Sequence, residues 1–126
     1  MHKMARATQA LSDETRLRIL NLLMVKECCV CEVMQGLDIS QTRASRNLKV
    51  LNDAGFLKMR TEGLFTLYAL TDAKSSFQTD LIGIMRKEFA TNKLAGNDIE
   101  RLANAERVGP GCGPQKNKNE PCCSPG

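Results

Sequence analysis

The sequence predicts a mainly α-helical domain that carries a single β-hairpin. Apolar residues recur at helical spacing in several segments, and two short segments of strand composition flank Thr61-Glu62-Gly63. All four prolines lie at or beyond position 110, among closely spaced glycines. We therefore expect one folded domain over residues 1–105 and a flexible Cys/Pro/Gly-rich tail over residues 106–126.

Two helices are expected in the first third of the chain. The first covers residues 13–25, with Ser12 as its N-cap and acidic residues in its first turn, where the helix dipole favours negative charge. Its apolar stripe consists of Leu17, Leu20, Leu23 and Met24. A short second helix over residues 30–36 is expected to end at Gly36, ahead of a tight turn over residues 37–39.

A third helix, the hairpin and a fourth helix follow. Ser40 is the expected N-cap of a helix that runs to Asp53, with Gly55 as its stop signal. Strands are expected over residues 56–60 and 64–70. A helix over residues 75–91 and a short final helix over residues 98–105 complete the body. This order of elements is that of a winged helix-turn-helix domain.

The third helix has the composition of a DNA-reading helix. Thr42, Ser45, Arg46 and Lys49 fall on one side of the helical wheel, opposite the apolar Ala44, Leu48 and Leu51. Hydroxyls and cations on one face can contact base edges and phosphates in the major groove, although a solvated polar face gives the same pattern. The candidate DNA-contacting residues are Ser40, Gln41, Thr42, Arg43, Ser45, Arg46, Lys49 and, on the hairpin, Arg60.

Net charge and the lack of targeting signals limit the partners and the cell compartment that we expect for this protein. The net charge of +4 is compatible with nucleic-acid binding without requiring it. No apolar run reaches the roughly 18 residues of a membrane span, and the first residues lack a signal-peptide pattern, so we expect a cytoplasmic protein with no membrane partner. Cytoplasmic thiols stay reduced, so the six cysteines point to metal binding or redox sensing rather than to structural disulfides.

Three of these cysteines cluster at the start of the second helix. Cys28 and Cys31 are spaced i,i+3 and are expected to share a helix face, whereas Cys29 and Cys31 diverge by about 200° on an ideal helix. One ion could reach both only by distorting the first turn, which would strain the helix ahead of the reading helix. The helix N-terminus is expected to lower the thiol pKa values and so favour the ligating thiolate form. Small cysteines that merely fill the core are the plainer alternative.

A set of motifs in one order resembles the ArsR/SmtB family of metalloregulatory repressors. The motifs are Leu11-Ser12-Asp13-Glu14-Thr15-Arg16-Leu17, then Cys29-Val30-Cys31-Glu32-Val33, then Ser40-Gln41 with Ser45-Arg46-Asn47-Leu48, then Ala54-Gly55-Phe56-Leu57, and finally Glu62-Gly63 with Tyr68 and Leu70. The resemblance implies a homodimeric winged helix repressor that binds double-stranded operator DNA without a cofactor and is released by an inducer. It places the sulfur ligands of the family's Cys-Val-Cys box on Cys29 and Cys31.

The departures from the family pattern bear on the inducer. Arsenite-responsive members usually carry another cysteine three residues after the box, where this chain has Met34. Cys28 or a tail thiol could replace it, so the candidate ion ligands are Cys28, Cys29, Cys31, Cys112, Cys122 and Cys123. The only histidine is His2, which argues against a zinc or nickel site. Soft sulfur ligands favour As(III) or Sb(III) as inducer, with Cd(II) or Pb(II) as the alternative.

Two other classes of function use the same cysteines. A thiol redox sensor on the same scaffold could use Cys28 with Cys31, or Cys122 with Cys123. An enzyme is not expected, because no histidine or other clear base partner lies beside the cysteines and no cofactor-binding glycine motif is present. We also expect the chain to form a homodimer, because one apolar stripe is too large for the surface of a monomer. The stripe consists of Phe77, Leu81, Ile84, Met85 and Phe89, with Met4 and Leu11.

Overall fold

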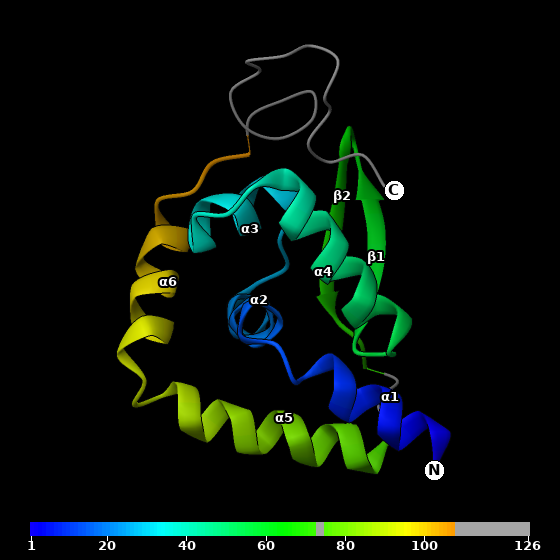
Figure 1. The fold of residues 1–126 in the computed structure, drawn as a ribbon. Helices are drawn as coiled ribbons and strands as arrows, with labels where there is room; N and C mark the ends of the chain where they lie inside the picture. The colour runs from blue at the N-terminus through cyan, green and yellow to red at the C-terminus, as the bar shows by residue number, and fades with distance from the viewer. Residues whose placement is uncertain (73–74, 108–126) are drawn as a thin grey trace.

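The computed structural model describes residues 1–72 and 75–107, and it confirms a mainly helical fold with one antiparallel hairpin (Figure 1). The elements in chain order are α1 (His2–Ala10), α2 (Glu14–Val25), α3 (Val30–Leu37), α4 (Gln41–Asp53), β1 (Leu57–Glu62), β2 (Phe65–Leu70), α5 (Ser76–Phe89) and α6 (Lys93–Ala103). Helix–turn–helix followed by a hairpin is the winged helix arrangement. Within the described residues, no helix is long and apolar enough to cross a bilayer.

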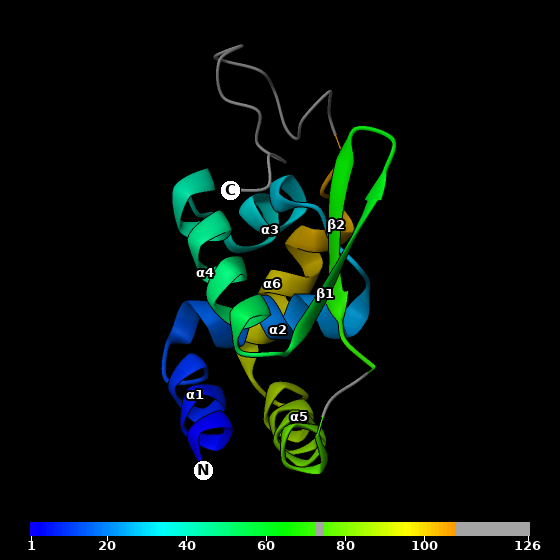
Figure 2. The same ribbon diagram turned by 90° about the vertical axis from the view of Figure 1, so that its right-hand side faces the viewer.

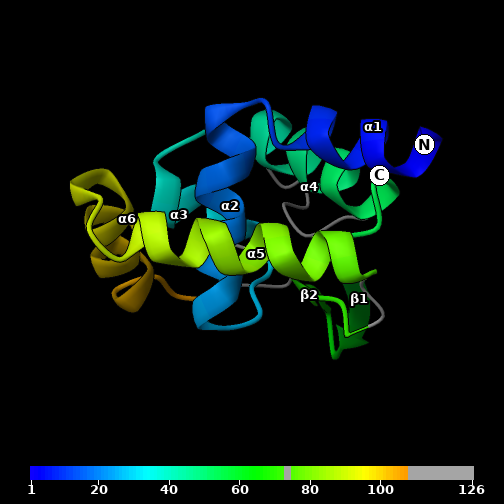
Figure 3. The same cartoon turned by 90° about the horizontal axis from the view of Figure 1, so that it is seen from below.

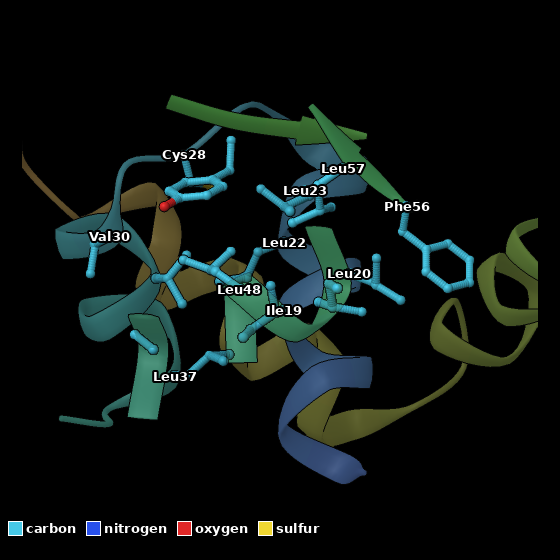
Figure 4. Close-up of a cluster of buried hydrophobic side chains, with 14 of the residues drawn as sticks. Ile19, Leu20, Leu22, Leu23, Cys28, Val30, Leu37, Leu48, Phe56 and Leu57 are labelled. Atoms are coloured by element: carbon cyan, nitrogen blue, oxygen red, sulfur yellow. The ribbon is translucent and has the colours of Figure 1, made fainter. Parts of the chain in front are cut away.

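Helix α2 forms the centre of the domain. Figure 1 views it almost end-on, with the other helices and the hairpin around it. Ile19, Leu20 and Leu22 are completely buried, and Leu48 of α4 and Phe56 join the same cluster (Figure 4). Burial of such side chains stabilises each by about 1.5–3 kcal/mol. This cluster fixes α3 and α4 relative to each other through their common contact with α2.

The hairpin, hereafter the wing, projects beside α4 (Figure 2). Its strands pair from Leu57 with Leu70 to Glu62 with Phe65, which leaves Gly63 and Leu64 as a two-residue turn. Gly63 has φ 61°, and glycine is the residue that accepts positive φ at the first position of such a turn. The turn therefore shares only Gly63 with the predicted Thr61-Glu62-Gly63, because Thr61 and Glu62 are paired in β1.

Two helix boundaries predicted from the sequence are wrong. Asp13, not Ser12, caps α2, because its carboxylate accepts the Arg16 N–H at 3.1 Å. Helix α3 continues through Gly36 and ends at Asp38, which has the left-handed φ of 54°. Gly36 serves close packing instead, since a Cβ there would lie 2.9 Å from Leu22 Cδ1.

Helix α6 begins earlier than predicted and is integrated into the core. Asn92 caps it by accepting the Ala95 N–H at 3.0 Å, so the helix starts at Lys93 rather than at residue 98. The completely buried Asp98 accepts two hydrogen bonds from Arg18 of α2, at 2.8 and 2.9 Å, and pairs with Arg101. Arg101 and Arg18 also donate to the carbonyls of Gly36 and Leu37, at 2.8 and 3.3 Å. The end of α3 is thus tied to both α2 and α6.

Helix α5 lies across α2 on the lower side of the molecule (Figure 3). Of its residues only Ile82 is buried, whereas Ile84 remains 60% exposed. The other members of the predicted stripe on α5 are half-buried, and Met4 of α1 is 44% exposed. An apolar surface therefore spans α1 and α5.

Candidate functional site

Cys29 and Cys31, hereafter the cysteine pair, lie at the start of α3. Cys29 is the N-cap residue, with extended φ and ψ of −85° and 171°, and Cys31 is the second residue of the helix. Because Cys29 stands outside the helix, its Sγ reaches Cys31 Sγ at 2.8 Å. The predicted divergence of about 200° assumed that both residues were helical. The prediction that one ion must distort the first turn is therefore wrong.

Cys28 is held apart from this pair. Its N–H donates to the Tyr68 carbonyl at 3.0 Å, and its carbonyl accepts the Tyr68 N–H at 2.8 Å, so it forms a bridge to β2. Its Sγ contacts the Lys26 carbonyl at 3.5 Å. Figure 4 shows Cys28 at the edge of the buried cluster, close to Val30. Because Cys28 is not helical, the expectation that it shares a helix face with Cys31 is wrong.

The thiols of Cys28, Cys29 and Cys31 are buried, and burial raises the pKa values of the first two, which the helix N-terminus was expected to lower. Burial, together with the nearby Glu32 charge, raises the pKa of Cys28 to about 12. The contact with the Cys31 sulfur, together with burial, raises the pKa of Cys29. The prediction that the helix N-terminus lowers these pKa values is wrong for Cys28 and Cys29, because desolvation of a thiolate outweighs the helix dipole. At neutral pH both are thiols that must lose a proton to bind an ion.

The Glu32 side chain contacts the backbone of the cysteine pair. Its carboxylate accepts the Cys29 N–H at 3.0 Å and pairs with Lys26 at 2.6 Å and Arg107 at 2.8 Å. Burial alone would raise the pKa of Glu32, but the hydrogen bonds from Lys26, from the Cys29 N–H and from Arg107 lower it below its ordinary value. The carboxylate is therefore ionised, and it fixes the cap conformation that brings the two sulfurs together.

Residues 105–107, hereafter the strap, lie against the cysteine pair. The Gln35 side chain donates to the Glu106 carbonyl at 2.8 Å and accepts the Glu106 N–H at 3.1 Å. Cys31 Sγ contacts the same carbonyl at 3.7 Å, and Arg107 reaches Glu32. Gln35 was not predicted as a site residue, although its position one turn after Cys31 was a usable signal. The last described residues of the chain therefore lie next to the two thiols.

The predicted ligands are only partly brought together. The structure places Cys29 and Cys31 side by side, whereas Cys28 faces another way. Among residues 1–72 and 75–107, no three His, Cys, Asp or Glu side chains are grouped so as to hold a metal ion. Cys112, Cys122 and Cys123 lie outside the described residues. The site as described supplies two sulfur donors.

The candidate DNA-contacting face lies between α4 and the wing. Ser40 caps α4 as predicted, accepting the Arg43 N–H at 3.2 Å. A groove of about 540 Å³ separates the helix from the hairpin. Its lining residues are Gln41, Thr42, Ser45, Arg46, Lys49, Asn52, Asp53, Met59 and Tyr68. Met59 and Tyr68, paired across the two strands, were not predicted for this surface.

The predicted DNA-contacting side chains differ in their exposure and in their contacts with other residues. Thr42, Arg46 and Lys49 are exposed, and no hydrogen bond or ion pair holds Arg46 within the described part of the chain. The Ser45 hydroxyl is buried without a hydrogen-bond partner among the described residues, although it lines the groove.

Two of the predicted DNA-contacting cations, Arg43 and Arg60, already bind other side chains of the domain. Arg43 donates to the Thr15 hydroxyl of α2 at 2.8 Å. Arg60 pairs with Glu27 and with Glu62, so it ties the wing to the residue before Cys28. Among the predicted cations of the described residues, Arg46 of α4 therefore has no ion-pair partner, and Lys49 of α4 is paired only with Asp53, at 3.5 Å.

Comparison with known proteins identifies relatives of the same architecture. The sequence pattern of a bacterial regulatory protein family, the arsR family, matches residues 13–58, from α2 into β1. The arsenic resistance transcriptional regulator ArsR2 of Pseudomonas putida is 32% identical over 99 residues, which cover 78% of this chain and 84% of the relative.

Two further relatives match over shorter segments. A cadmium resistance transcriptional regulatory protein CadC homolog of Staphylococcus aureus is 39% identical over 69 residues, or 54% of this chain. The arsenical resistance operon repressor of Escherichia coli is 44% identical over 62 residues, or 48% of this chain. These matches span 57% and 53% of the two relatives, a little over half of their length.

Among solved structures, HlyU from Vibrio cholerae is similar in fold. It superposes with a TM-score of 0.62 at 27% sequence identity, and the match covers 71% of this chain and 95% of that protein. The similarity therefore extends over nearly the whole of the solved chain rather than over an isolated motif.

Proposed function

This chain is a member of the ArsR family of bacterial transcriptional regulators, and from that premise we propose that it is an operator-binding repressor released from DNA by arsenite or antimonite. The observation that supports this proposal is the cysteine pair, whose sulfurs lie 2.8 Å apart at the start of α3, the helix before α4. Two converging thiols in a buried site suit a small thiophilic ion better than a hard cation.

The ligand exchange proceeds without oxidation or reduction. Arsenite is As(OH)₃, and each thiol replaces one hydroxide: an arsenic–sulfur bond forms, an arsenic–oxygen bond breaks, and the thiol proton leaves with the hydroxide as water. Cys29 and Cys31 supply two sulfurs, and the third comes from another cysteine of the chain. Neutral thiols are suitable reactants here because each proton is consumed on the leaving group.

DNA binding is assigned to α4 and the wing. Helix α4 enters the major groove with Arg46 toward guanine edges and Lys49 toward phosphates. The groove between α4 and the wing then accommodates the DNA backbone, and Thr42 lies at the end of α4 that meets the bases. Since Arg60 is paired with Glu27 and Glu62, most of the electrostatic attraction comes from α4.

The cysteine pair is connected to the wing by the two residues before it. Cys28 is bridged to Tyr68 of β2, and Glu27 is paired with Arg60 of β1. An ion that draws Cys29 toward Cys31 and a third sulfur displaces this segment and, with it, the wing. By linkage, the factor by which the ion weakens operator binding equals the factor by which the operator weakens ion binding.

The repressor is proposed to act as a homodimer. The apolar surface of α1 and α5, which includes the 60% exposed Ile84, is covered by the same surface of a second chain. A two-fold dimer places two copies of α4 about one DNA turn apart, which matches a palindromic operator.

Cadmium or lead is the second candidate inducer. The CadC homolog of Staphylococcus aureus is named for cadmium resistance, and the same two sulfurs are soft donors for both ions. These ions tend to recruit a fourth ligand, whereas arsenic(III) is complete with three sulfurs.

The test is a titration of the reduced protein with arsenite, antimonite, Cd(II), Pb(II) and Zn(II). Operator release is followed by fluorescence anisotropy, and ion binding by sulfur-to-metal absorbance. We expect arsenite and antimonite to release the operator from the wild-type protein. Cys29→Ser and Cys31→Ser should retain operator affinity and lose the release. A Cys31→Ser protein that dissociates normally with arsenite would remove the cysteine pair from the mechanism.

A further inference from the structure

The tip of the wing carries an exposed leucine. Gly63 and Leu64 form the two-residue turn between β1 and β2, and Leu64 is 70% exposed. A Cβ placed on Gly63 would meet no heavy atom of the described residues within 4 Å, so the tip stands clear of the domain. Turns usually carry Gly, Asn, Asp, Ser or Pro. The turn itself therefore gives no reason for an apolar side chain at position 64.

The charges of the wing are not placed to bind DNA at its tip. Lys58 is paired with Asp72 at 3.0 Å. Arg60 is paired with Glu27 and Glu62. The charge nearest the tip in sequence is the carboxylate of Glu62, which repels phosphate. A contact between the tip and DNA would therefore be made by the apolar side chain.

The position of the wing directs its tip toward the minor groove. Met59 and Tyr68 line the groove beside α4 that is proposed to hold the DNA backbone. The turn lies four positions further along each strand, or about 13 Å. The minor groove adjoins the major groove across that backbone and is about 7.5 Å deep, so the tip is long enough to reach its floor. In Figures 1 and 2 the tip points toward the same end of the molecule as the first residues of α4.

We infer that Leu64 contacts the floor of the minor groove and selects A·T over G·C pairs beside the site that α4 reads. This inference rests on the proposed function, because it adds a residue to the same DNA contact. A single exposed leucine is common on protein surfaces. The position of Leu64 at the free end of a wing whose cations are already paired is what assigns it to DNA.

The chemistry of the minor groove supplies the selectivity. A·T and T·A pairs present only acceptors there, whereas a G·C pair adds the projecting N2 amino group of guanine. A leucine side chain pressed onto that amino group removes its water and accepts no hydrogen bond, which is unfavourable. Over A·T pairs the projecting group is absent, so the side chain packs closer. Proteins that bind the minor groove use apolar side chains in this way.

The experiment varies the minor groove and keeps the major groove constant. The probe is the duplex that the wild-type protein selects from a random pool, with the base pairs flanking each α4 contact remade as A·T, G·C or inosine·cytosine. An inosine·cytosine pair has the major-groove edge of G·C but lacks the guanine amino group. We expect wild type to bind the A·T and inosine·cytosine duplexes alike and the G·C duplex about fivefold or more weakly.

Two variants assign this preference to Leu64. Leu64→Ala should bind the A·T duplex about fivefold more weakly and reduce the preference to less than about twofold, because the apolar contact is lost. Leu64→Asn supplies an acceptor for the guanine amino group and should bind the G·C duplex at least as well as the A·T duplex. Leu94→Ala, which removes a 39% exposed leucine from α6, is the matched control and should equal wild type.

The outcomes separate the inference from the function on which it rests. A Leu64→Ala protein with wild-type affinity and preference overturns the inference alone, and a change confined to its sedimentation would make the tip a protein contact instead. A wild type that rejects inosine·cytosine as strongly as G·C would place the discrimination in the major groove and would also overturn the inference. A wild type that selects no sequence from the pool overturns the proposed function as well.

Discussion

Tyr68 and Cys28 exchange two backbone hydrogen bonds, of 2.8 and 3.0 Å, that join the wing to the segment carrying the cysteine pair. The bridge is isolated, because Tyr68 belongs to β2 whereas Cys28 belongs to neither strand. It is therefore a local connection whose loss need not disturb the pairing of β1 with β2.

Cys28→Pro should separate ion binding from operator release. Proline has no N–H, so the variant loses the hydrogen bond to the Tyr68 carbonyl. We expect arsenite to bind the cysteine pair as in wild type while its effect on operator affinity falls severalfold. Cys28→Ala is the control, because it keeps the bridge and should retain full coupling. Thermal unfolding confirms that both variants are folded, and a Cys28→Pro protein with normal release would exclude the bridge from the signal path.

Substitutions of Arg46 should distinguish base reading from phosphate binding. Arg46→Ala should weaken operator binding by about 1–3 kcal/mol if the guanidinium contacts a guanine edge at two points. Arg46→Lys retains the charge, so it should lose sequence preference but keep the salt dependence. Anisotropy titrations over a range of salt concentrations, with operator and unrelated DNA, measure both effects.

Lys49→Ala should act on all DNA sequences alike. Lys49 is exposed and only loosely paired with Asp53, at 3.5 Å, so it is available to a phosphate. Loss of one phosphate contact reduces the slope of log affinity against log salt by about one. An unchanged slope, together with unchanged affinity after both Lys49→Ala and Arg46→Ala, would show that α4 does not enter the groove.

The apo protein should lose stability as the pH rises above 9. The folded state holds the Cys28 pKa at about 12, above its ordinary value of 9.0. Below pH 9 the thiol is protonated in both states; between pH 9 and 12 the unfolded chain releases the proton while the folded chain keeps it. This thiol should therefore lower the free energy of unfolding by about 1.4 kcal/mol per pH unit in that range. Urea unfolding of the reduced protein should show a shallower decline for Cys28→Ala, and parallel curves would contradict the assignment.

Ile84→Glu should convert the proposed dimer to a monomer. Ile84 is 60% exposed on α5, so a charge there costs little in one chain but would be buried between two. Sedimentation at micromolar concentration should show the wild type as a dimer and the variant as a monomer with about tenfold or greater loss of operator affinity. Thr79→Glu, exposed on the other side of α5, is the charge-matched control. A wild-type monomer under these conditions would refute the dimer.

The sequence predicted the order of elements from α2 to α6, because each had a local signal, but it did not predict α1 (His2–Ala10), which has no side-chain cap hydrogen bond. Ser40 caps α4 as expected, and Gly55 has the positive φ of 89° that marks a stop. Helix α6 was predicted too short, because Asn92 was not recognised as its N-cap.

The candidate site was harder to predict, because its geometry depends on single-residue boundaries and long-range contacts. Whether Cys29 is helical or a cap decides whether its sulfur meets that of Cys31. The pairing of Arg60 with Glu27 joins residues 33 positions apart, and that of Gln35 with Glu106 spans 71 positions. Periodicity does not encode such contacts, since they arise only when the chain has folded.

The buried carboxylate of Asp98 makes α6 and the turn before α4 one cooperative unit. Arg101, also on α6, donates to the Gly36 carbonyl, and Arg18 of α2 donates to the Leu37 carbonyl, so unwinding α6 would remove the carboxylate partner of Arg18 and the donor to Gly36 together. In amide hydrogen exchange, the protected protons of α6 and of the residues around Asp38 should therefore exchange with one common opening free energy. A protease that cuts within α6 would then disturb the turn that precedes α4 without cutting α4 itself.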